Sequence, residues 1–377
     1  MNPRVLKPEG FKWLDRVVDI CAAQGIYTIL DMHTVPGGQN GDWHSDSAHH
    51  VAEFWNHKDF QDRAIWLWEI LAEHYKNNPW IAGYNPLNEP CDPTHSRLQE
   101  WYHRAYGAIR KIDPNHIIFL DGNTFASDWS HFNPAETCKK WENTVYSVHD
   151  YSNFGFPSPK PAYAASSEQK AKVRRAYEKK VKFMHDNGLP IWNGEFGPVY
   201  ARELFDHGDW QGINNSRILL LRDQLALYEE ERIPWSIWLY KDIGFQGMTY
   251  VGPTTPYMTR FKDFLLKKHR LAIDAWGADS SSVDRIYKPL EEFIKENVDE
   301  KYRALYPAPV WKFEQRISRL SRNMLLAEYL VQEWADHFVG LSFEELDALA
   351  ASFKLENCVQ RDELNKTLVE FKGTYEK

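Results

Sequence analysis

The feature that most constrains the fold is a repeat in which a short apolar run is followed by an amphipathic stretch, about six times before residue 270. The apolar runs, which we expect to be strands, span 26–32, 81–84, 117–120, 144–148, 190–192 and 234–239. The stretches that we expect to be helices span 11–23, 60–76, 98–112, 168–187 and 218–231. Strands that alternate with helices predict a parallel sheet of βα units, either a (β/α) barrel or an open doubly wound sheet.

The chain changes character after residue 271, where apolar runs give way to helical patterns over 283–297, 311–338, 343–353 and 361–371. We expect no strands in this part. Within 311–338, helical spacing predicts one apolar stripe, made of Ile317, Leu320, Met324, Leu325, Ala327 and Leu330. The segment Ser280-Ser-Ser282 is the expected boundary. We therefore predict a barrel over 1–275 and a helical C-terminal extension over 276–377, packed on the barrel rather than acting as a separate partner-binding module.

Composition excludes several classes of protein. The 45 Lys and Arg residues against 53 Asp and Glu residues give a net charge of −8, which argues against a nucleic-acid partner. No apolar run approaches about 20 residues, so we expect no membrane partner. Four scattered cysteines without a CxxC pair fit reduced thiols in the cytoplasm, with one disulfide left open. The N-terminus lacks the apolar core of a secretory signal, although secretion stays open if residues precede Met1.

Two glutamates follow apolar runs and carry the strongest functional signal. Glu89 ends the segment Ile81-Ala-Gly-Tyr-Asn-Pro-Leu-Asn-Glu89, and Glu195 follows 190–192 between Gly194 and Gly197. The carboxyl ends of barrel strands line the active site, so both glutamates can face one mouth. Two carboxylates about 5–5.5 Å apart are what glycoside hydrolysis by double displacement requires.

These motifs resemble glycoside hydrolase family 5, the cellulase-like branch of the retaining barrel enzymes. Asn88-Glu89-Pro90 matches the acid/base motif of the family, and Gly194-Glu-Phe-Gly197 matches its nucleophile motif. The resemblance covers about residues 10 to 260. It implies a (β/α)8 barrel of the TIM type, Glu89 as the acid/base, Glu195 as the nucleophile, a carbohydrate substrate, and neither a metal nor another cofactor.

The same resemblance implies a set of sugar-contacting residues: His33, Asn88, His149, Tyr151 and Trp238. Asn88 would bind the sugar 2-hydroxyl, Tyr151 would donate to Glu195, and Trp238 would lie under the sugar. The two histidines would bind hydroxyls or orient the acid. Long aromatic loops add Trp43, and the last loop adds Lys241 and Asp242 as hydroxyl binders.

The N-terminal end departs from the family pattern. In that pattern the second helix of the barrel would be residues 11–23, and the third strand would be residues 26–32. The ten residues before them cannot supply two strands and a helix, nor the family's arginine on the second strand. We expect an N-terminally incomplete barrel, with truncation rather than cover by the helical extension as the reason. An open sheet edge of this kind favours self-association.

The substrate is the least constrained part of the prediction. Long loops over a barrel mouth favour a pocket, and hence an exo-acting β-glycosidase on a β-glucoside or a related small glycoside. An endo-β-glucanase or mannanase and an inactive carbohydrate-binding barrel stay open. A metallohydrolase is a further alternative, although the spacing of its candidate ligands matches no ligand motif. Those candidates are Asp31, His33, Asp42, His44, Asp46, His49 and His50.

Overall fold

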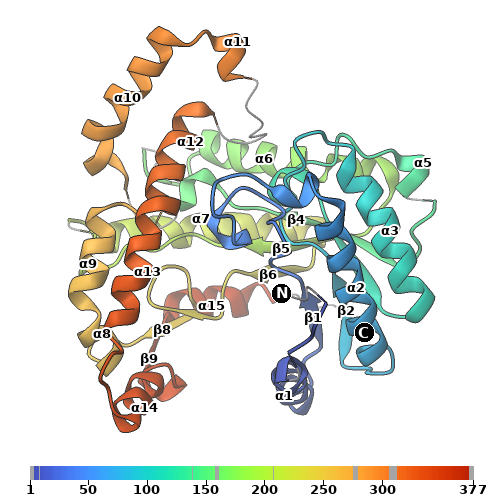
Figure 1. Ribbon diagram of the computed structural model, residues 1–377, viewed down its shortest axis with the longest axis horizontal. Coiled ribbons are helices and arrows are strands. Elements are labelled where there is room, and N and C mark those ends of the chain that lie inside the picture. The colour runs from blue at the N-terminus through green and yellow to red at the C-terminus, as the bar shows by residue number, and fades with distance from the viewer. Residues whose placement is uncertain are drawn as a thin grey trace. The chain divides into compact units, whose positions relative to one another are not determined.

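The computed structural model describes residues 4–7, 9–137, 139–157, 161–206, 208–274, 279–304 and 312–372. They form two compact units (Figure 1), which we describe separately. The first comprises the chain up to His149 together with Lys180–Trp192, and the second comprises most of the remainder. The expected boundary at 275/276, the expected helix start at Trp311, and Cys138 lie outside the described residues. Cys21, Cys91 and Cys358 are free thiols.

The first unit contains a parallel sheet whose strands follow chain order. Its strands are β1 (Thr28–Asp31), β2 (Ile81–Asn85), β3 (Ile117–Asp121) and β4 (Thr144–His149). The backbone N–H of Tyr146 donates to the carbonyl of Pro190 over 2.9 Å, so the beginning of β5 (Ile191–Phe196) continues this order. A doubly wound sheet would reverse its strand order at a switch point. The sequential order is therefore that of a barrel.

Helices connect these strands, and their buried aromatic rings form the core of the first unit. The helices are α1 (Glu9–Ala23), α2 (Lys58–Tyr75) and α3 (Arg97–Ile112), with shorter pieces η1 (Trp43–Ser45), η2 (Glu53–Trp55), α4 (Asn123–Ala126) and α5 (Pro134–Thr137). Trp68 on α2 packs 5.5 Å from the Tyr84 ring and donates its indole N–H to the Pro86 carbonyl over 2.9 Å. Trp101 and Trp129 are also fully buried. Much of the tryptophan content therefore serves packing, since buried aromatic rings contribute the largest apolar areas.

The sheet of the first unit ends at β1 in the part of the chain that the structure describes. Within the described ranges β1 has β2 as its one strand neighbour. On α1 the side chains of Trp13, Val17 and Ile20 are 55%, 58% and 56% exposed. A hollow of about 560 Å³ lies between α1 and β1. The expected open edge is therefore present, and self-association through it stays a prediction.

The second unit holds the end of β5, which pairs in parallel with β6 (Trp235–Ile237). Its longer helices are α6 (Ser167–Asn187), which continues into the first unit, and α7 (Trp210–Glu231), and η3 (Asn153–Gly155) is a short turn. A second sheet contains β7 (Lys241–Asp242), β8 (Thr249–Val251) and β9 (Cys358–Gln360).

The expectation that strands stop after residue 271 is wrong, because β9 pairs antiparallel with β8. Three residues are too few to show the alternation of a strand in the sequence. The Arg361 guanidinium lies 4.2 Å from the Tyr200 ring, and its Nε donates to the Gly247 carbonyl over 2.9 Å. These contacts with residues far away in the sequence hold β9 next to β8.

The remaining helices of the second unit are α8 (Pro256–Arg260), α9 (Lys262–Arg270), η4 (Ser281–Val283), α10 (Asp284–Asn297), α11 (Glu300–Arg303), α12 (Phe313–Arg319), η5 (Leu320–Leu326), α13 (Ala327–Asp336), α14 (Phe343–Ala351), η6 (Leu355–Asn357) and α15 (Asp362–Glu370). A capping box begins α14, because Ser342 Oγ accepts from the Glu345 N–H and the Glu345 carboxylate accepts from the Ser342 N–H. None of the described helices is long and apolar enough to span a membrane.

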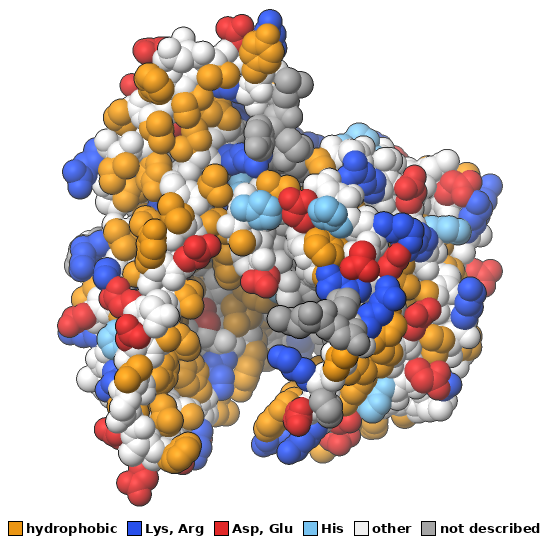
Figure 2. All heavy atoms as spheres, viewed as in Figure 1, with side chains coloured by type: hydrophobic (Ala, Val, Ile, Leu, Met, Phe, Trp, Pro, Cys, Tyr) orange, Lys and Arg blue, Asp and Glu red, His pale blue; other side chains and the backbone are white. Residues whose placement is uncertain are grey.

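The single apolar stripe predicted for 311–338 is wrong, because the π-helix η5 interrupts the helix. A π-helix bonds i to i+5 and changes which side chains share a face. Met324 and Leu330 are buried, whereas Leu320 and Leu325 are 42% and 50% exposed. Figure 2 shows hydrophobic side chains gathered over α10 and α13 of this unit.

Candidate active site

Glu89 lies four residues beyond the end of β2, in a strained backbone conformation. Its φ angle is +47°, in the left-handed region that residues with a Cβ rarely adopt. Its N–H donates to Oδ2 of Asp121, the last residue of β3, over 2.9 Å. Strain of this kind persists where surrounding contacts fix the chain, and it gathers at functional sites.

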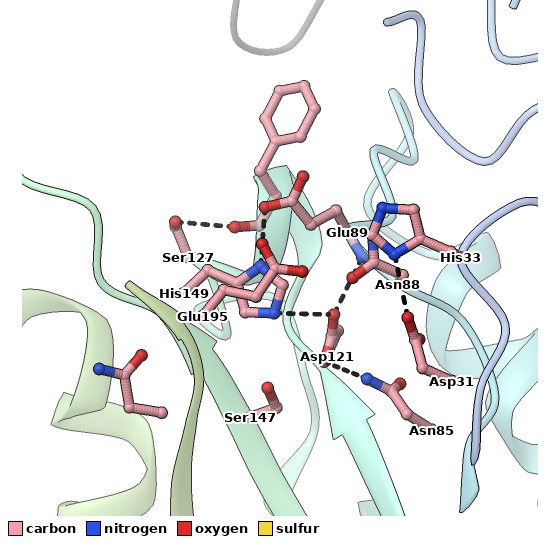
Figure 3. A network of polar contacts seen from close by, with 12 residues as sticks. Asp31, His33, Asn85, Asn88, Glu89, Asp121, Ser127, Ser147, His149 and Glu195 are labelled. Carbon is pink, nitrogen blue, oxygen red and sulfur yellow. Dashed lines mark hydrogen bonds and ion pairs between the residues drawn. The ribbon is translucent and has the colours of Figure 1, made fainter. Parts of the chain in front are cut away.

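Asp121 is fully buried and anchors this turn (Figure 3). Its Oδ1 accepts a hydrogen bond of 3.3 Å from the side-chain amide of Asn85. The Tyr102 hydroxyl donates to its carbonyl over 2.8 Å and accepts from its N–H over 3.1 Å. Burial raises the pKa of the Asp121 carboxyl. Asp121 thus joins the end of β3 to the Glu89 backbone.

The Glu89 carboxylate lies between two imidazoles and is 5% exposed. Its Oε1 is 2.7 Å from Nδ1 of His149, at the end of β4, and its Oε2 is 2.9 Å from Nε2 of His44. Burial raises the pKa of Glu89, whereas hydrogen bonds donated by His149 and His44 lower it. With both imidazoles donating, the pKa lies below its usual range. Nε2 of His149 is 3.6 Å from Oδ2 of Asp121 (Figure 3).

Asn88 precedes Glu89, is buried, and has a fixed backbone. Its N–H donates to the Met32 carbonyl over 3.2 Å, and its carbonyl accepts from the Gln39 side chain over 2.8 Å. Its Nδ2 is buried and has no hydrogen-bond partner in the part of the chain that the structure describes. A buried amide without a partner is destabilising, so this donor suits a polar ligand atom.

Aromatic rings surround His44 in the same unit. The exposed Trp43 ring packs edge-on at 5.7 Å, the Phe125 ring lies at 5.9 Å, and the His33 ring lies at 6.1 Å. Nδ1 of His33 is 2.9 Å from the Asp31 carboxylate. The structure thus brings five predicted residues into one neighbourhood of the first unit: His33, Trp43, Asn88, Glu89 and His149.

The second unit carries the other predicted carboxylate. Glu195 lies in β5, and its Oε2 accepts a hydrogen bond of 2.9 Å from the Tyr151 hydroxyl. Trp238 follows β6, and its N–H donates to the Phe196 carbonyl over 2.9 Å. Gly197 has a φ of +139°, and a Cβ there would lie 2.8 Å from the Trp238 carbonyl oxygen, so this approach requires glycine.

Lys241 and Asp242 have partners within the fold. The Lys241 ammonium donates to the Phe353 carbonyl over 2.6 Å. The Asp242 carboxylate accepts from the backbone N–H groups of Gly244, Phe245 and Gln246 at 2.8, 3.0 and 2.7 Å. These contacts shape the β7–β8 turn, so we do not include either residue in the proposed sugar site.

The histidine-rich loop after β1 pairs its imidazoles with different carboxylates. His49 contacts Glu53, and Nε2 of the buried His50 is 3.7 Å from Oδ1 of Asp42.

Another group, His95, Asp128 and His131, has its potential ligand atoms within 4.8 Å of one another. However, the centroids of its two imidazoles are 3.9 Å apart with the ring planes tilted by 35°, and the Asn123 amide donates to Nδ1 of His95. Nδ1 of His95 is therefore occupied by this hydrogen bond, which leaves the ring proton on the other nitrogen.

Sequence reasoning missed three residues of the Glu89 neighbourhood. Asp121 ends an apolar run, as do both predicted glutamates, so the pattern that found them could have found it. His44 and Asn40 carry no such signal, because they lie in a long loop where spacing predicts no contact.

Sequential parallel strands that deliver a buried glutamate near a strand end are the arrangement of a (β/α) barrel enzyme, whose active site lies at the carboxyl ends of the strands. Residues 2–244 match the family model "Cellulase (glycosyl hydrolase family 5)". A β-xylosidase of Phanerodontia chrysosporium is 63% identical over 370 residues, 98% of this chain and 77% of that protein. The chain belongs to glycoside hydrolase family 5.

A more distant relative and a solved structure are also similar to this chain, the latter in its fold. Endoglucanase C of Acetivibrio thermocellus is 23% identical over 276 residues, 64% of this chain and 75% of that protein. The structure of Thermotoga maritima Cel5A with mannotriose has a TM-score of 0.51 at 20% identity, covering 67% of this chain and 76% of that one. The predicted family, the TIM-barrel-type fold with an incomplete barrel, and the glycoside hydrolase class are confirmed.

The Asp121 contact yields a stability prediction. Asp121→Ala leaves the Glu89 N–H without an acceptor, so the free energy of unfolding should fall by about 1–3 kcal/mol. Asp121→Asn keeps an oxygen that can accept this hydrogen bond and should lose less. Urea denaturation of both variants measures the difference. Wild-type stability in Asp121→Ala would show that the strained turn does not depend on this carboxylate.

Proposed function

We propose that this glycoside hydrolase is a retaining, exo-acting β-glycosidase that removes single xylose units from β-xylosides. Glu195 is the nucleophile and Glu89 is the acid/base. The observation that carries the proposal is that two glutamates at strand ends have different partners, imidazoles for Glu89 and a phenol for Glu195. When two carboxyl groups of one site have different surroundings, one can stay protonated and act as the acid while the other stays ionised.

Chain connectivity supports a joint role for the two glutamates. His149 contacts Glu89 and Tyr151 donates to Glu195, and Asp150 alone separates these two partners in the sequence. The Asp150 N–H donates to the Glu195 carbonyl over 2.9 Å. The end of β4 therefore supplies a partner to each carboxylate.

The proposed reaction has two steps. In the first, the Glu195 carboxylate attacks the anomeric carbon, the glycosidic C–O bond breaks, and the leaving oxygen takes the proton of Glu89. In the second, water attacks the anomeric carbon, the bond from that carbon to Glu195 breaks and frees the carboxylate, and Glu89 takes a proton from the attacking water. The Tyr151 hydroxyl orients the nucleophile and favours its ionised form.

Four side chains are proposed to contact the substrate. The Nδ2 of Asn88 is a donor for the sugar 2-hydroxyl, a hydrogen bond that strengthens in the transition state. The exposed Trp43 ring packs against His44 and provides a flat apolar surface on which a sugar ring can lie. Trp238 takes the position under the sugar, and His33 binds a hydroxyl.

The nature of the sugar follows from the similar β-xylosidase, whereas Endoglucanase C favours endo-glucanase action as the alternative. Chromatography of early xylohexaose products distinguishes the two. Exo action should give xylose and xylopentaose, and cellohexaose should be cleaved at least about tenfold more slowly, a difference of about 1.4 kcal/mol in transition-state binding. Products of intermediate length, or faster cleavage of cellohexaose, would support the endoglucanase.

The acid role of Glu89 predicts a dependence on the leaving group. Glu89→Gln should slow phenyl β-xyloside by about 10²–10⁴-fold, the usual contribution of general acid catalysis. It should affect glycosylation by 2,4-dinitrophenyl β-xyloside far less, because that leaving group needs no proton. Stopped-flow release of each phenol measures both, with the exposed Glu73→Gln as the control. Equal losses for both substrates would contradict the assigned role.

A further inference from the structure

The turn between β7 and β8 has both kinds of backbone group bound by charged side chains. The Asp242 carboxylate accepts from three N–H groups of the turn, at 2.8, 3.0 and 2.7 Å. The Arg361 guanidinium binds two carbonyls, because Nε donates to Gly247 over 2.9 Å and Nη2 donates to Gly244 over 2.6 Å. A planar guanidinium presents its donors in a rigid fork, so it fixes the two acceptors relative to each other. These contacts give the turn one defined shape.

Arg361 reaches this turn from the C-terminal extension, 114 residues beyond one of its acceptors. Its own N–H donates to the Met248 carbonyl over 3.0 Å, and the side-chain amide of Asn365 donates to the same carbonyl over 3.2 Å. Its guanidinium lies 4.2 Å from the Tyr200 ring and 4.7 Å from the Tyr250 ring, distances at which a cation is attracted to an aromatic face. The extension therefore binds the turn through both backbone and side chains.

On another side the turn contacts the segment that follows Glu195. The Phe245 carbonyl accepts from the Tyr200 N–H over 2.7 Å, and the side-chain amide of Gln246 donates to the Gly197 carbonyl over 3.1 Å. Gln246 is buried, so this hydrogen bond is costly to break. Gly197 lies two residues after Glu195. The turn therefore supports the chain where it leaves β5, directly after the proposed nucleophile.

The residues after the turn contact the segment that carries Trp238. The Met248 N–H donates to the Leu239 carbonyl over 2.9 Å, and the Thr249 N–H donates to the Tyr240 carbonyl over 3.1 Å. Leu239 directly follows Trp238. One turn, bound by the extension, therefore supports two segments that each carry a residue of the proposed active site.

We propose that Arg361 is a positioning residue of this hydrolase, which fixes the places of Glu195 and Trp238 through the β7–β8 turn. The inference rests on the proposed function, in which Glu195 is the nucleophile and Trp238 lies under the sugar. Nucleophilic attack needs the reacting atoms about 3–3.5 Å apart and aligned, and small displacements are costly. The C-terminal extension therefore contributes to catalysis, although Arg361 touches no reacting atom.

The test uses two substitutions of Arg361. Arg361→Met keeps an apolar stem beside the tyrosine rings but donates no hydrogen bond, and Arg361→Lys keeps the charge without the fork that binds both carbonyls. Gln246→Ala removes the hydrogen bond between the turn and Gly197. The control is Arg222→Met, which removes an ion pair of α7 with Glu370 on α15 and leaves the hydrogen bonds of the turn in place.

The first readout is kcat/KM for phenyl and 2,4-dinitrophenyl β-xyloside. Both should fall by the same factor in Arg361→Met, at least about tenfold, because both need attack by a correctly placed Glu195. Arg361→Lys should restore part of the loss, and Arg222→Met should match wild type. Arg361→Met combined with Gln246→Ala should lose less than the product of the two single losses, because both changes act through one turn.

The second readout separates misplacement from unfolding. Labelling with 2,4-dinitrophenyl 2-deoxy-2-fluoro-β-xyloside should still reach one group per chain in Arg361→Met, at a rate at least about tenfold lower. Unfolding would instead reduce the number of chains that become labelled. Hydrogen exchange, followed by mass spectrometry, should be at least about tenfold faster for the N–H groups of Tyr200 and Met248, and unchanged in α3.

A folded Arg361→Met with the labelling rate and the hydrogen exchange of wild type would overturn this inference. Losses that multiply in the double variant, or a loss confined to the phenyl substrate, would also contradict it. Failure of the proposed function would look different, because the wild-type chain would then hydrolyse neither xyloside. Hydrogen exchange needs no turnover, so in that case it would still show whether Arg361 holds the segment after Glu195.

Discussion

A single buried carboxyl, that of Glu89, is the constraint on which the rest of the site depends. Its backbone is held in a left-handed conformation by Asp121, and its two oxygens contact His149 and His44. An ionisable group taken out of water must be paired or neutral. The contacts around the Glu89 carboxyl determine whether it is paired as an anion or is neutral, and therefore whether it can act as an acid.

The parallel strands supply these contacts because their carboxyl ends meet at one edge. β2 delivers Glu89, β3 ends at Asp121, and β4 ends at His149. β5 delivers Glu195 by the same arrangement in the second unit, with Tyr151 as its partner. The loop after β1 adds His44, which no strand end specifies.

The sequence predicted the strands β1 to β6 because each is a short apolar run, and it predicted that Glu89 and Glu195 follow two of these runs. It did not predict that His44 and Asn40 lie beside Glu89, since loop contacts depend on tertiary packing that spacing does not encode. The strand β9 was too short for its pattern to appear, and the π-helix η5 altered a helical face that regular spacing had predicted. Nothing in the sequence indicated that the Lys241 ammonium, predicted as a hydroxyl binder, donates to the Phe353 carbonyl, 112 residues away in the chain.

The most direct measurement of the double-displacement account is covalent trapping with a 2-deoxy-2-fluoro-β-xyloside that bears a dinitrophenyl leaving group. Fluorine slows both steps while the activated leaving group still departs, so the glycosyl–enzyme should accumulate. Mass spectrometry of the intact chain and its peptides should locate one fluoroxylosyl group on Glu195, and none in Glu195→Gln. Attachment to a different residue, or turnover of xylosides by an enzyme that never becomes labelled, would contradict the account.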